Sequence, residues 1–252
     1  DTTRLTGAEM LRHALGLEGG GITGGVTLAG ASWAGDLLRA AGDVRDEPDT
    51  RPPGFSGELR SYQAEAVGWL NFLDDAGLGG CLALDMGLGK TPTILARIAT
   101  SPGDTPALVV APPAVVGNWA AEAKRFTPDL TVLVHHGPSR VNGPELRSRI
   151  RKSDLVVTTY GTAVRDIDEL SDLDWDRVVL DEAQVIKNHR SATAKELRKL
   201  KARTRLALTG TPIENGLGDL WAIMDFCNPG LVGGRTAFID QLGQIGDSAG
   251  AA

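Results

Sequence analysis

The sequence lacks several features that would define other classes of protein. It has only 2 cysteines and 4 histidines in 252 residues, which favours neither a disulfide scaffold nor a structural metal centre. We interpret Cys81 and Cys227 as buried free thiols. No stretch approaches the roughly 18 uncharged apolar residues of a membrane helix, and the first residues lack the layout of a secretory signal. We therefore expect a folded cytoplasmic protein with no membrane contact and no structural metal.

An excess of positive charge is also missing, since the formal net charge is −6. This argues against a uniformly basic surface but leaves local basic patches open. Between Lys187 and Arg205, eight lysines and arginines stand against the single acid Glu196, and a second basic cluster lies within 147–152. Two interpretations of these runs remain open: a solvated helix face, or contact with the phosphates of DNA.

Residues 1–54 have the pattern of a flank and a linker. Thr6 and Glu9 have capping-box spacing before a short helix through Leu17, and a glycine-rich run then breaks the helical pattern. Three prolines within 46–54 predict a linker before the main domain.

The pattern changes after this linker. From Leu59 onward, apolar residues recur at helical spacing and predict an amphipathic helix that ends near Gly77. Six short apolar runs then follow: 80–85, 106–112, 131–136, 154–160, 177–181 and 205–209. Near-continuous hydrophobicity is typical of strands covered on both faces, so the sequence predicts an α/β fold with a doubly wound, mainly parallel sheet. We expect this domain to span 55–235 and residues 236–252 to form a flexible tail.

A glycine loop follows the first apolar run. Gly-Leu-Gly-Lys-Thr at 87–91 stands between that run and a predicted helix, so its backbone N–H groups can approach phosphate oxygens. Lys90 can reach the β and γ phosphates, and the Thr91 hydroxyl can ligate Mg²⁺. Position 84 is Leu where the general P-loop pattern has Gly, so the pattern is incomplete. Pro92 falls in the first helical turn, where its missing N–H would have no helical partner.

Two adjacent acids stand at the end of the run 177–181. Asp181 can hold Mg²⁺ through its water shell, while Glu182 can orient and deprotonate the attacking water. An isolated acidic pair at a strand end more commonly faces solvent. Together with the glycine loop, however, this pair completes a magnesium-ATP site, so the sequence predicts ATP and Mg²⁺ as ligands and an ATPase as the enzyme.

Several segments stand in the order of the helicase-like motifs of Swi/Snf-type ATPases, and the sequence resembles that family over about residues 55–235. The segments are Leu59-Arg60-Ser61-Tyr62-Gln63, Asp85 to Thr91, Asn118-Trp119 with Glu122 and Phe126, Thr158 to Gly161, Asp181 to Gln184, and Leu208 to Asn215. The resemblance implies a RecA-like P-loop lobe, a three-layer sandwich, from a superfamily two DNA translocase of the bacterial type. It also implies that the flank is the end of the N-terminal extension found in bacterial members.

The resemblance assigns roles to individual residues. Gln63 would recognise the adenine edge through its side-chain amide, and Thr209 and Thr211 would link the state of the γ-phosphate to lobe closure. The implied nucleotide-binding residues are Arg60, Gln63, Asp85, Met86, Gly87, Leu88, Gly89, Lys90 and Thr91. The implied coupling residues are Gln184, Thr209, Gly210 and Thr211.

Contact with the backbone of double-stranded DNA is also implied. The segments 112–119 and 158–161 match those that touch the tracked strand, and contacts of this kind carry no sequence information. The candidate DNA-binding residues are Pro112, Asn118, Thr159, Tyr160, Lys195, Arg198 and Lys199. Pro113 and Ala114 occupy positions where relatives usually have hydroxyl residues, which predicts weaker binding there. Trp119 is interpreted as a core residue rather than as a platform for base stacking.

The leading hypothesis is an ATP-dependent motor that moves along duplex DNA and remodels protein–DNA complexes. An RNA helicase of the DEAD-box type is a second interpretation, against which the glycine loop and Gln184 argue. A non-catalytic scaffold is a third, against which the intact site residues argue. Only 37 residues follow Asn215, too few for another sheet. We therefore expect the motor to need a missing second RecA-like lobe, and this chain alone to hydrolyse little ATP.

Overall fold

The structure is a computed structural model, and it describes residues 48–240 and residue 242. The helix expected after Thr6 lies outside these residues, as do residue 241 and residues 243–252 of the tail expected at 236–252. Residues 236–240 of that expected tail are described and are helical. None of the helices that the structure does describe is long and apolar enough to cross a membrane.

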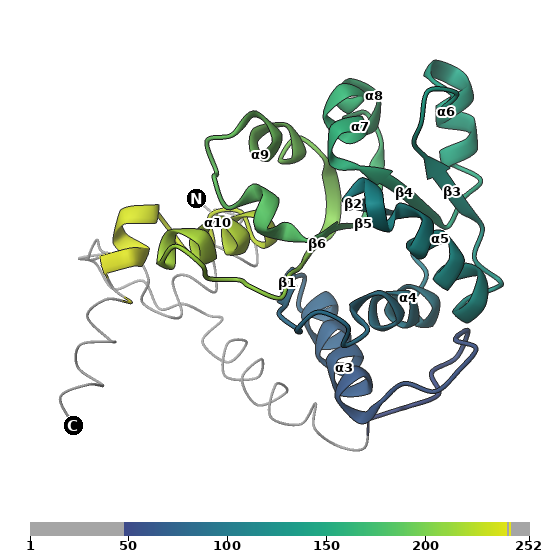
Figure 1. Cartoon of the computed structure of the whole chain (residues 1–252), viewed down its shortest axis with the longest axis horizontal. Helices are drawn as coiled ribbons and strands as arrows, with labels where there is room; N and C mark the ends of the chain where they lie inside the picture. The colour runs from purple at the N-terminus through teal and green to yellow at the C-terminus, as the bar shows by residue number, and fades with distance from the viewer. Residues whose placement is uncertain (1–47, 241, 243–252) are drawn as a thin grey trace, which may run out of the picture.

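Helices and strands alternate along the chain (Figure 1). The strands are β1 (Gly80–Leu82), β2 (Ala107–Ala111), β3 (Val132–His135), β4 (Leu155–Thr159), β5 (Asp174–Asp181) and β6 (Lys201–Leu208). The helices are α3 (Ser61–Asp75), α4 (Lys90–Thr100), α5 (Pro113–Phe126), α6 (Gly143–Ile150), α7 (Tyr160–Arg165), α8 (Ile167–Ser171), α9 (Ala192–Leu197) and α10 (Leu217–Cys227), with a 3-10 turn, η1, at Ala183–Ile186.

The six strands form one sheet in the order β1-β6-β5-β2-β4-β3. Every neighbouring pair in this sheet runs parallel. Each of the six predicted apolar runs corresponds to one strand, so the prediction of an α/β fold with a parallel sheet is confirmed. Because the strands are parallel, their carboxyl ends share one edge, which we call the carboxyl edge.

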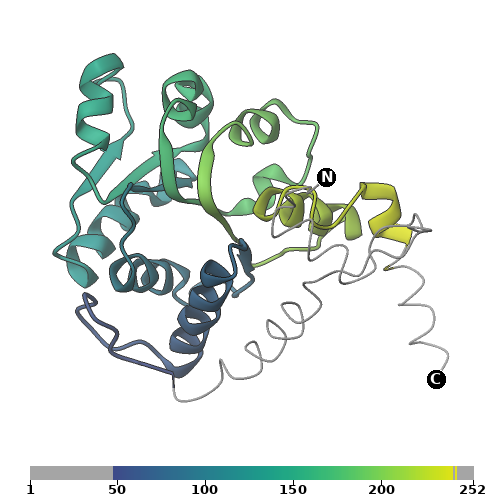
Figure 2. The ribbon, with the colours of Figure 1, turned by 180° about the vertical axis from the view of Figure 1, so that it is seen from behind.

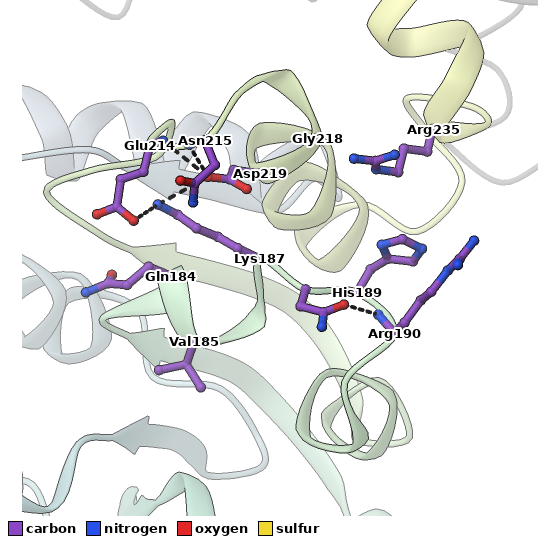
Figure 3. A pocket seen from close by; sticks show the side chains of 11 residues that line it. Gln184, Val185, Lys187, His189, Arg190, Glu214, Asn215, Gly218, Asp219 and Arg235 are labelled. Carbon is purple, nitrogen blue, oxygen red and sulfur yellow. Dashed lines mark hydrogen bonds and ion pairs between the residues drawn. The ribbon is translucent and has the colours of Figure 1, made fainter.

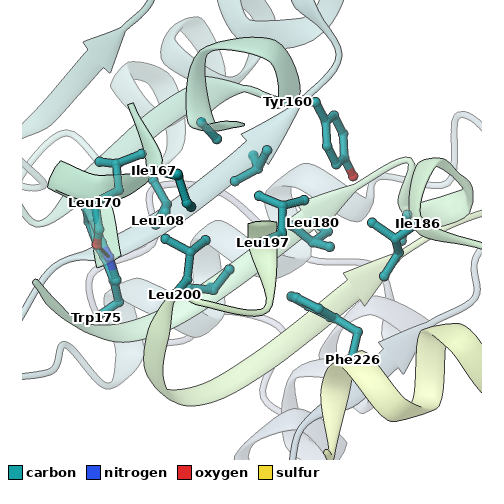
Figure 4. Packing of buried hydrophobic residues seen from close by; sticks show 14 of the residues in the cluster. Leu108, Tyr160, Ile167, Leu170, Trp175, Leu180, Ile186, Leu197, Leu200 and Phe226 are labelled. Carbon is teal, nitrogen blue, oxygen red and sulfur yellow. Dashed lines mark hydrogen bonds between the residues drawn. The ribbon is translucent and has the colours of Figure 1, made fainter. Parts of the chain in front are cut away.

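Helices cover both faces of the sheet, which confirms the three-layer arrangement. Helices α3, α4 and α5 lie on one face and α6 to α9 on the other, with α10 beside β1 and β6 (Figures 1 and 2). Side chains alternate between the faces, as expected for strands. Val109 and Val179 pack beneath α4 and α5, whereas Leu108 and Leu180 belong to the opposite cluster, with Phe226 of α10 (Figure 4).

The helix predicted from Leu59 onward is α3. It ends at Asp75 and is followed by Gly77 with a φ of 68°, a left-handed conformation that favours glycine after a helix end. Helix α4 begins at Lys90, so Pro92 lies in its first turn as expected. Both helices pack on the same face of the sheet and bring their residues to the glycine loop between β1 and α4.

Strands β5 and β6 begin earlier than predicted. The apolar runs indicated starts near 177 and 205, but the strands start at Asp174 and Lys201. The early part of β5 includes Asp176, which is charged yet buried because it pairs with Arg177, and Arg177 in turn pairs with Asp74 of α3. A hydrophobicity pattern misses such residues, since it scores a buried ion pair as two polar positions.

Candidate nucleotide site at the carboxyl edge

Three sequence motifs leave the sheet from adjacent strand ends. Leu82 at the end of β1 pairs with Leu208 at the end of β6, and Leu208 pairs with Asp181 at the end of β5. The glycine loop follows β1, the Thr-Gly-Thr segment follows β6, and the Asp-Glu pair stands at the end of β5. The sheet register therefore brings the glycine loop beside the Thr-Gly-Thr segment, although Thr209 follows Thr91 by 118 residues in sequence.

The glycine loop has a backbone conformation, with positive φ, that residues other than glycine rarely adopt. Gly87 and Gly89 have φ values of 82° and 77°, and a Cβ at position 89 would collide with the Gln63 amide. Lys90 begins α4, and its Nζ donates to the carbonyl oxygens of Leu84 at 2.9 Å and Asp85 at 3.3 Å. A cation and the first N–H groups of α4 thus stand at one loop, an arrangement that can hold phosphate.

Two side chains of α3 hold this loop from below. The Gln63 amide donates to the Leu88 carbonyl at 3.1 Å, and the Tyr62 hydroxyl donates to the same oxygen at 3.0 Å. The Oε1 atom of Gln63 accepts from the N–H of Arg60 at 2.8 Å. In the structure Gln63 is therefore buried beneath the loop that it contacts, and Tyr62 is a loop contact that sequence reasoning missed.

Asp181 is buried and fully engaged at the end of β5. Its Oδ2 accepts from the indole N–H of Trp119 at 2.8 Å, and its Oδ1 accepts from the N–H of Glu182 at 3.0 Å. Burial raises the pKa of the Asp181 carboxyl, and the Glu182 charge adds to this rise, whereas these two hydrogen bonds and the Lys90 charge oppose it. The positive charge of Lys90 thus favours the ionised form of Asp181.

Glu182 has an unusual backbone. Its φ of 52° makes it the one non-glycine residue with positive φ in the described part of the chain. Its Oε2 accepts from the Gln184 amide at 2.7 Å, and Oε1 of Gln184 accepts from the Thr209 hydroxyl at 3.0 Å. A strained residue that is held by neighbouring side chains is typical of functional sites.

Gly210 completes this cluster, because its Cα faces the glycine loop. A Cβ built there would lie 3.6 Å from the Leu84 carbonyl oxygen and 3.7 Å from the Met86 amide nitrogen. The Thr-Gly-Thr segment therefore lies against the loop that carries Lys90, and all four predicted coupling residues belong to one site.

The segments predicted to touch DNA leave the neighbouring strands β2 and β4. Asn118 is exposed on α5, but Thr159 and Tyr160 are buried. The Thr159 hydroxyl bonds with Thr162, and the Tyr160 hydroxyl donates to the Asp181 carbonyl at 2.8 Å. Their side chains are thus occupied within the protein. Trp119 is fully buried, which confirms its interpretation as a core residue.

The basic residues of the stretch 187–205 differ in their partners and in their exposure. Arg198 pairs with Asp225 at 3.2 Å and Lys199 with Glu196 at 2.7 Å. Both residues directly precede β6, which starts at the edge of the sheet opposite to the carboxyl edge. Lys195 is exposed on α9. The structure therefore does not bring Arg198 and Lys199 to the edge that carries Asn118 and Asp181.

A cavity of about 600 Å³ lies beside the Thr-Gly-Thr segment (Figure 3). Its walls include Lys187, Glu214 and Asp219, and Lys187 Nζ lies 2.9 Å from Glu214 Oε2. Sequence reasoning assigned Lys187 only to a basic run, gave Glu214 no role within the segment Leu208 to Asn215, and missed Asp219. Their sequence signal was weak, because charged residues are usually solvated.

Together, the parallel sheet and the glycine loop facing an Asp-Glu pair define a RecA-like P-loop domain. The SNF2-related domain family matches residues 62–246, and the chain belongs to this family. It is 42% identical over 207 residues to YwqA of Bacillus subtilis, an ATP-dependent helicase/translocase by name, covering 80% of this chain. It is 39% identical over 206 residues to the TATA-binding protein-associated factor mot1 of Schizosaccharomyces pombe, covering 76% of this chain.

This chain spans only part of these relatives, 22% of YwqA and 10% of mot1. Among solved structures it is similar to the Sulfolobus solfataricus SWI2/SNF2 ATPase core in complex with double-stranded DNA. That similarity has a TM-score of 0.66 at 40% identity, over 75% of this chain and 39% of the other. The Swi/Snf resemblance and the RecA-like fold predicted from the sequence are thereby confirmed.

Proposed function

We propose that this domain binds and hydrolyses MgATP and that hydrolysis drives movement along double-stranded DNA, with remodelling of protein–DNA complexes. The observation that carries the proposal is the register of three strand ends, which sets the Lys90 loop beside Asp181 and Thr209. The names of the relatives, a helicase/translocase and a SWI2/SNF2 ATPase core bound to duplex DNA, support the same function.

The glycine loop would hold the phosphates. In the structure the Lys90 ammonium bonds to two loop carbonyls, and phosphate oxygens would replace these neutral acceptors with charged ones. The N–H groups at the start of α4 add positive potential at the same place. Asp85, Met86 and Leu88 would line the bound nucleotide through their backbone.

The residues present fit a magnesium ion. The Thr91 hydroxyl and the Asp181 carboxylate are oxygen donors, and Mg²⁺ prefers a few such donors together with water and phosphate oxygens. Trp119 and the Glu182 N–H hold Asp181 in one orientation. When bound, Mg²⁺ would neutralise charge on the phosphates. Glu182, oriented by Gln184, would take the proton of the attacking water.

Adenine recognition is proposed for Gln63 and Arg60. The Gln63 amide and carbonyl oxygen both have partners in the structure, so it would act while still supporting the loop. A Gln63→Glu variant tests this, because a carboxylate cannot donate to a base. We expect its preference for ATP over GTP to fall, whereas an unchanged preference would remove Gln63 from base recognition.

Coupling is proposed for Gln184, Thr209, Gly210 and Thr211. Gln184 joins Glu182 to Thr209, and the N–H of Thr211 donates to the Thr209 hydroxyl at 3.1 Å. A shift at Glu182 would therefore reach the loop after β6 through hydrogen bonds alone. Such a path could link nucleotide state to contacts made by that loop.

DNA contact is proposed at the ends of β2 and β4. The exposed amide of Asn118 and the exposed backbone near Gly161 and Pro112 can meet phosphates without reading bases. Thr159 and Tyr160 would act through backbone position, since their hydroxyls have partners in the protein.

Of the basic residues, Lys195 is the proposed DNA contact, because Arg198 and Lys199 are ion-paired. Lys195→Gln should reduce the salt dependence of DNA binding by about one unit of slope. An Arg198→Gln, Lys199→Gln double variant serves as the comparison and should leave that slope unchanged. A double variant that lowers the slope as much as Lys195→Gln would show that their ion pairs open on DNA.

A second RecA-like lobe is proposed to complete the site. The solved SWI2/SNF2 core extends well beyond the 39% that this chain covers. Apolar side chains are also exposed around the carboxyl edge, including Met86 at 82%, Val185 at 43% and Ile213 at 47%. Apolar residues exposed at one edge of a domain fit a surface that another domain covers.

The function is tested by measuring phosphate release from the full-length protein with duplex DNA, with RNA and with no nucleic acid, and by displacing a triplex-forming strand from duplex DNA. We expect duplex DNA to stimulate hydrolysis and ATP to drive displacement, with Lys90→Ala as the inactive control. Equal stimulation by RNA would favour an RNA helicase. Absence of nucleotide binding would favour a non-catalytic scaffold.

A further inference from the structure

Lys187 caps the end of η1, the 3-10 turn that follows the Asp-Glu pair, and its side chain is buried. Its side chain is only 8% exposed, although lysine is rarely buried without a partner. Its Nζ lies 2.9 Å from Oε2 of Glu214 and 3.6 Å from Oδ2 of Asp219 (Figure 3). The contact with Glu214 is an ion pair by distance rather than a well-aligned hydrogen bond.

The acids that Lys187 meets fix the loop between β6 and α10. This loop, 209–216, has no regular structure of its own. Asp219 in the first turn of α10 accepts from the N–H groups of Glu214 at 3.2 Å and Asn215 at 2.9 Å. Lys187 thus joins the element after β5 to the C-terminal part of an irregular loop that carries Thr209 and Thr211, and to the helix that follows it.

Contacts continue from Glu214 back to the Asp-Glu pair. Oε1 of Glu214 accepts from the Thr211 hydroxyl at 2.7 Å, and the Thr211 N–H donates to the Thr209 hydroxyl. Thr209 then donates to Gln184, whose amide holds Glu182. The N–H of Lys187 itself donates to the Gln184 carbonyl at 3.2 Å. The contacts therefore close a ring, which we call the Lys187 ring. Its members are Lys187, Glu214, Thr211, Thr209 and Gln184. Glu182 is bonded to this ring through the Gln184 amide.

We propose that Lys187 is a positioning residue for Glu182, acting through the Lys187 ring. This inference rests on the proposed ATPase function, because its catalytic consequence requires Glu182 to act on the attacking water. Lys187 does not touch the phosphate-binding loop residues in any described contact, so its effect should fall on turnover and not on nucleotide binding. Glu214 is 47% exposed, so the ion pair itself contributes little to global stability.

The proposal is tested in the full-length protein with Lys187→Met, Lys187→Arg, Glu214→Gln and the Lys187→Met, Glu214→Gln double variant. We expect Lys187→Met to lower kcat at saturating ATP and duplex DNA by about tenfold or more. KM and the Kd for MgATP should stay within about twofold. Arginine should restore most of the turnover, because it keeps the charge that meets the two acids. Glu58→Gln, which removes a surface pair with Arg51, is the matched control and should leave kcat unchanged.

The double variant distinguishes the ring from separate structural effects. If both residues act through one ring, adding Glu214→Gln to Lys187→Met should cause no further loss. Losses that multiply would overturn the proposal, as would an unchanged kcat or a rise in KM alone.

Hydrogen exchange gives a readout that needs no turnover. The Thr211 amide should exchange faster in Lys187→Met than in the wild type, and equal exchange would overturn the ring. A wild-type protein that does not hydrolyse ATP would instead defeat the proposed function, and with it the catalytic consequence, even if exchange confirms the ring.

Discussion

The indole N–H of Trp119 on α5 donates a hydrogen bond of 2.8 Å to Oδ2 of Asp181 at the end of β5. Both side chains are buried. The bond joins a helix that also carries Asn118, a proposed DNA contact, to the carboxylate proposed to hold magnesium. It also satisfies one oxygen of a carboxylate whose pKa burial raises.

Trp119→Phe should therefore weaken MgATP binding in a pH-dependent way. Losing the indole N–H leaves a buried carboxylate oxygen without a donor, which costs about 1–3 kcal/mol and raises the Asp181 pKa further. A protonated carboxyl binds metal poorly, so affinity should be lost at a higher pH than in the wild type as the pH falls. Calorimetry across pH measures this, and Trp69→Phe on the surface of α3 is the control. Identical pH profiles for Trp119→Phe and the wild type would disprove the coupling.

Lys90→Ala should abolish binding of MgATP. The variant removes the cation that would meet the β and γ phosphates, and no other lysine or arginine has a described contact with the loop carbonyls of Leu84 and Asp85. Calorimetry on the 252-residue chain tests this directly. Lys124→Ala, exposed on α5, is the comparison and should bind normally. Wild-type affinity in Lys90→Ala would remove this residue from the site.

Glu182→Gln in the full-length protein should retain nucleotide binding and lose turnover. An amide can still hydrogen-bond water and Gln184, but it cannot take a proton from water. We expect a fall in kcat of about 100-fold or more, the size typical of a lost general base. Phosphate release and calorimetry on one preparation separate the two effects. Hydrolysis at the wild-type rate would contradict the assignment of Glu182 as the base.

Asp74→Asn should destabilise the fold without touching the nucleotide site. Asp74 pairs with Arg97 and with the fully buried Arg177, at the edge of the sheet opposite to the carboxyl edge. Breaking a buried pair by removing one partner costs roughly 3–5 kcal/mol. Arg203→Met, which removes a 48% exposed partner of the same carboxylate, should cost about 1 kcal/mol or less.

The stability difference between the wild type and Asp74→Asn should depend on pH, and the pKa of Asp74 sets the direction. Burial would raise the pKa of Asp74, but Arg177 and Arg97 outweigh it, so the pKa lies below its ordinary value. A lowered folded-state pKa stabilises the protein above the ordinary pKa, and this contribution is lost as the pH falls through the folded-state value. Denaturation of wild type and Asp74→Asn should therefore differ most at neutral pH and converge in acid. A constant difference across this range would rule out the ion-pair explanation.

The 252-residue chain on its own should hydrolyse ATP very slowly, with or without duplex DNA. An arginine supplied from a second lobe is commonly worth about 10³ to 10⁵ in rate, which outweighs any contribution of the residues present here. Phosphate release from the purified chain, before and after fusion to a second RecA-like lobe, measures this difference. Robust DNA-stimulated turnover by the chain alone would show that one lobe suffices.

Local sequence patterns were enough to predict the strands, the start of α4 and the family. The six apolar runs predicted the strands because parallel strands covered on both faces are apolar throughout. The glycine loop and Pro92 predicted the start of α4, since glycine conformation and a missing N–H are properties of single residues. The motif order indicated the Swi/Snf family, because those residue types recur at fixed places on this fold.

Only the tertiary structure decided which side chains share a partner. The hydrogen bond of Trp119 to Asp181 joins residues 62 apart in sequence, and no local pattern encodes that distance. The burial of charged residues was also decided by the tertiary structure, in two places. Asp176 lay just outside the predicted apolar run 177–181, but it is a buried strand residue that pairs with Arg177. Lys187 looked like one of eight basic residues on a surface, yet packing removes it from water and commits it to Glu214. Whether a charge is solvated or paired depends on what the fold brings beside it, and that is set by the sheet order and not by the neighbours in sequence.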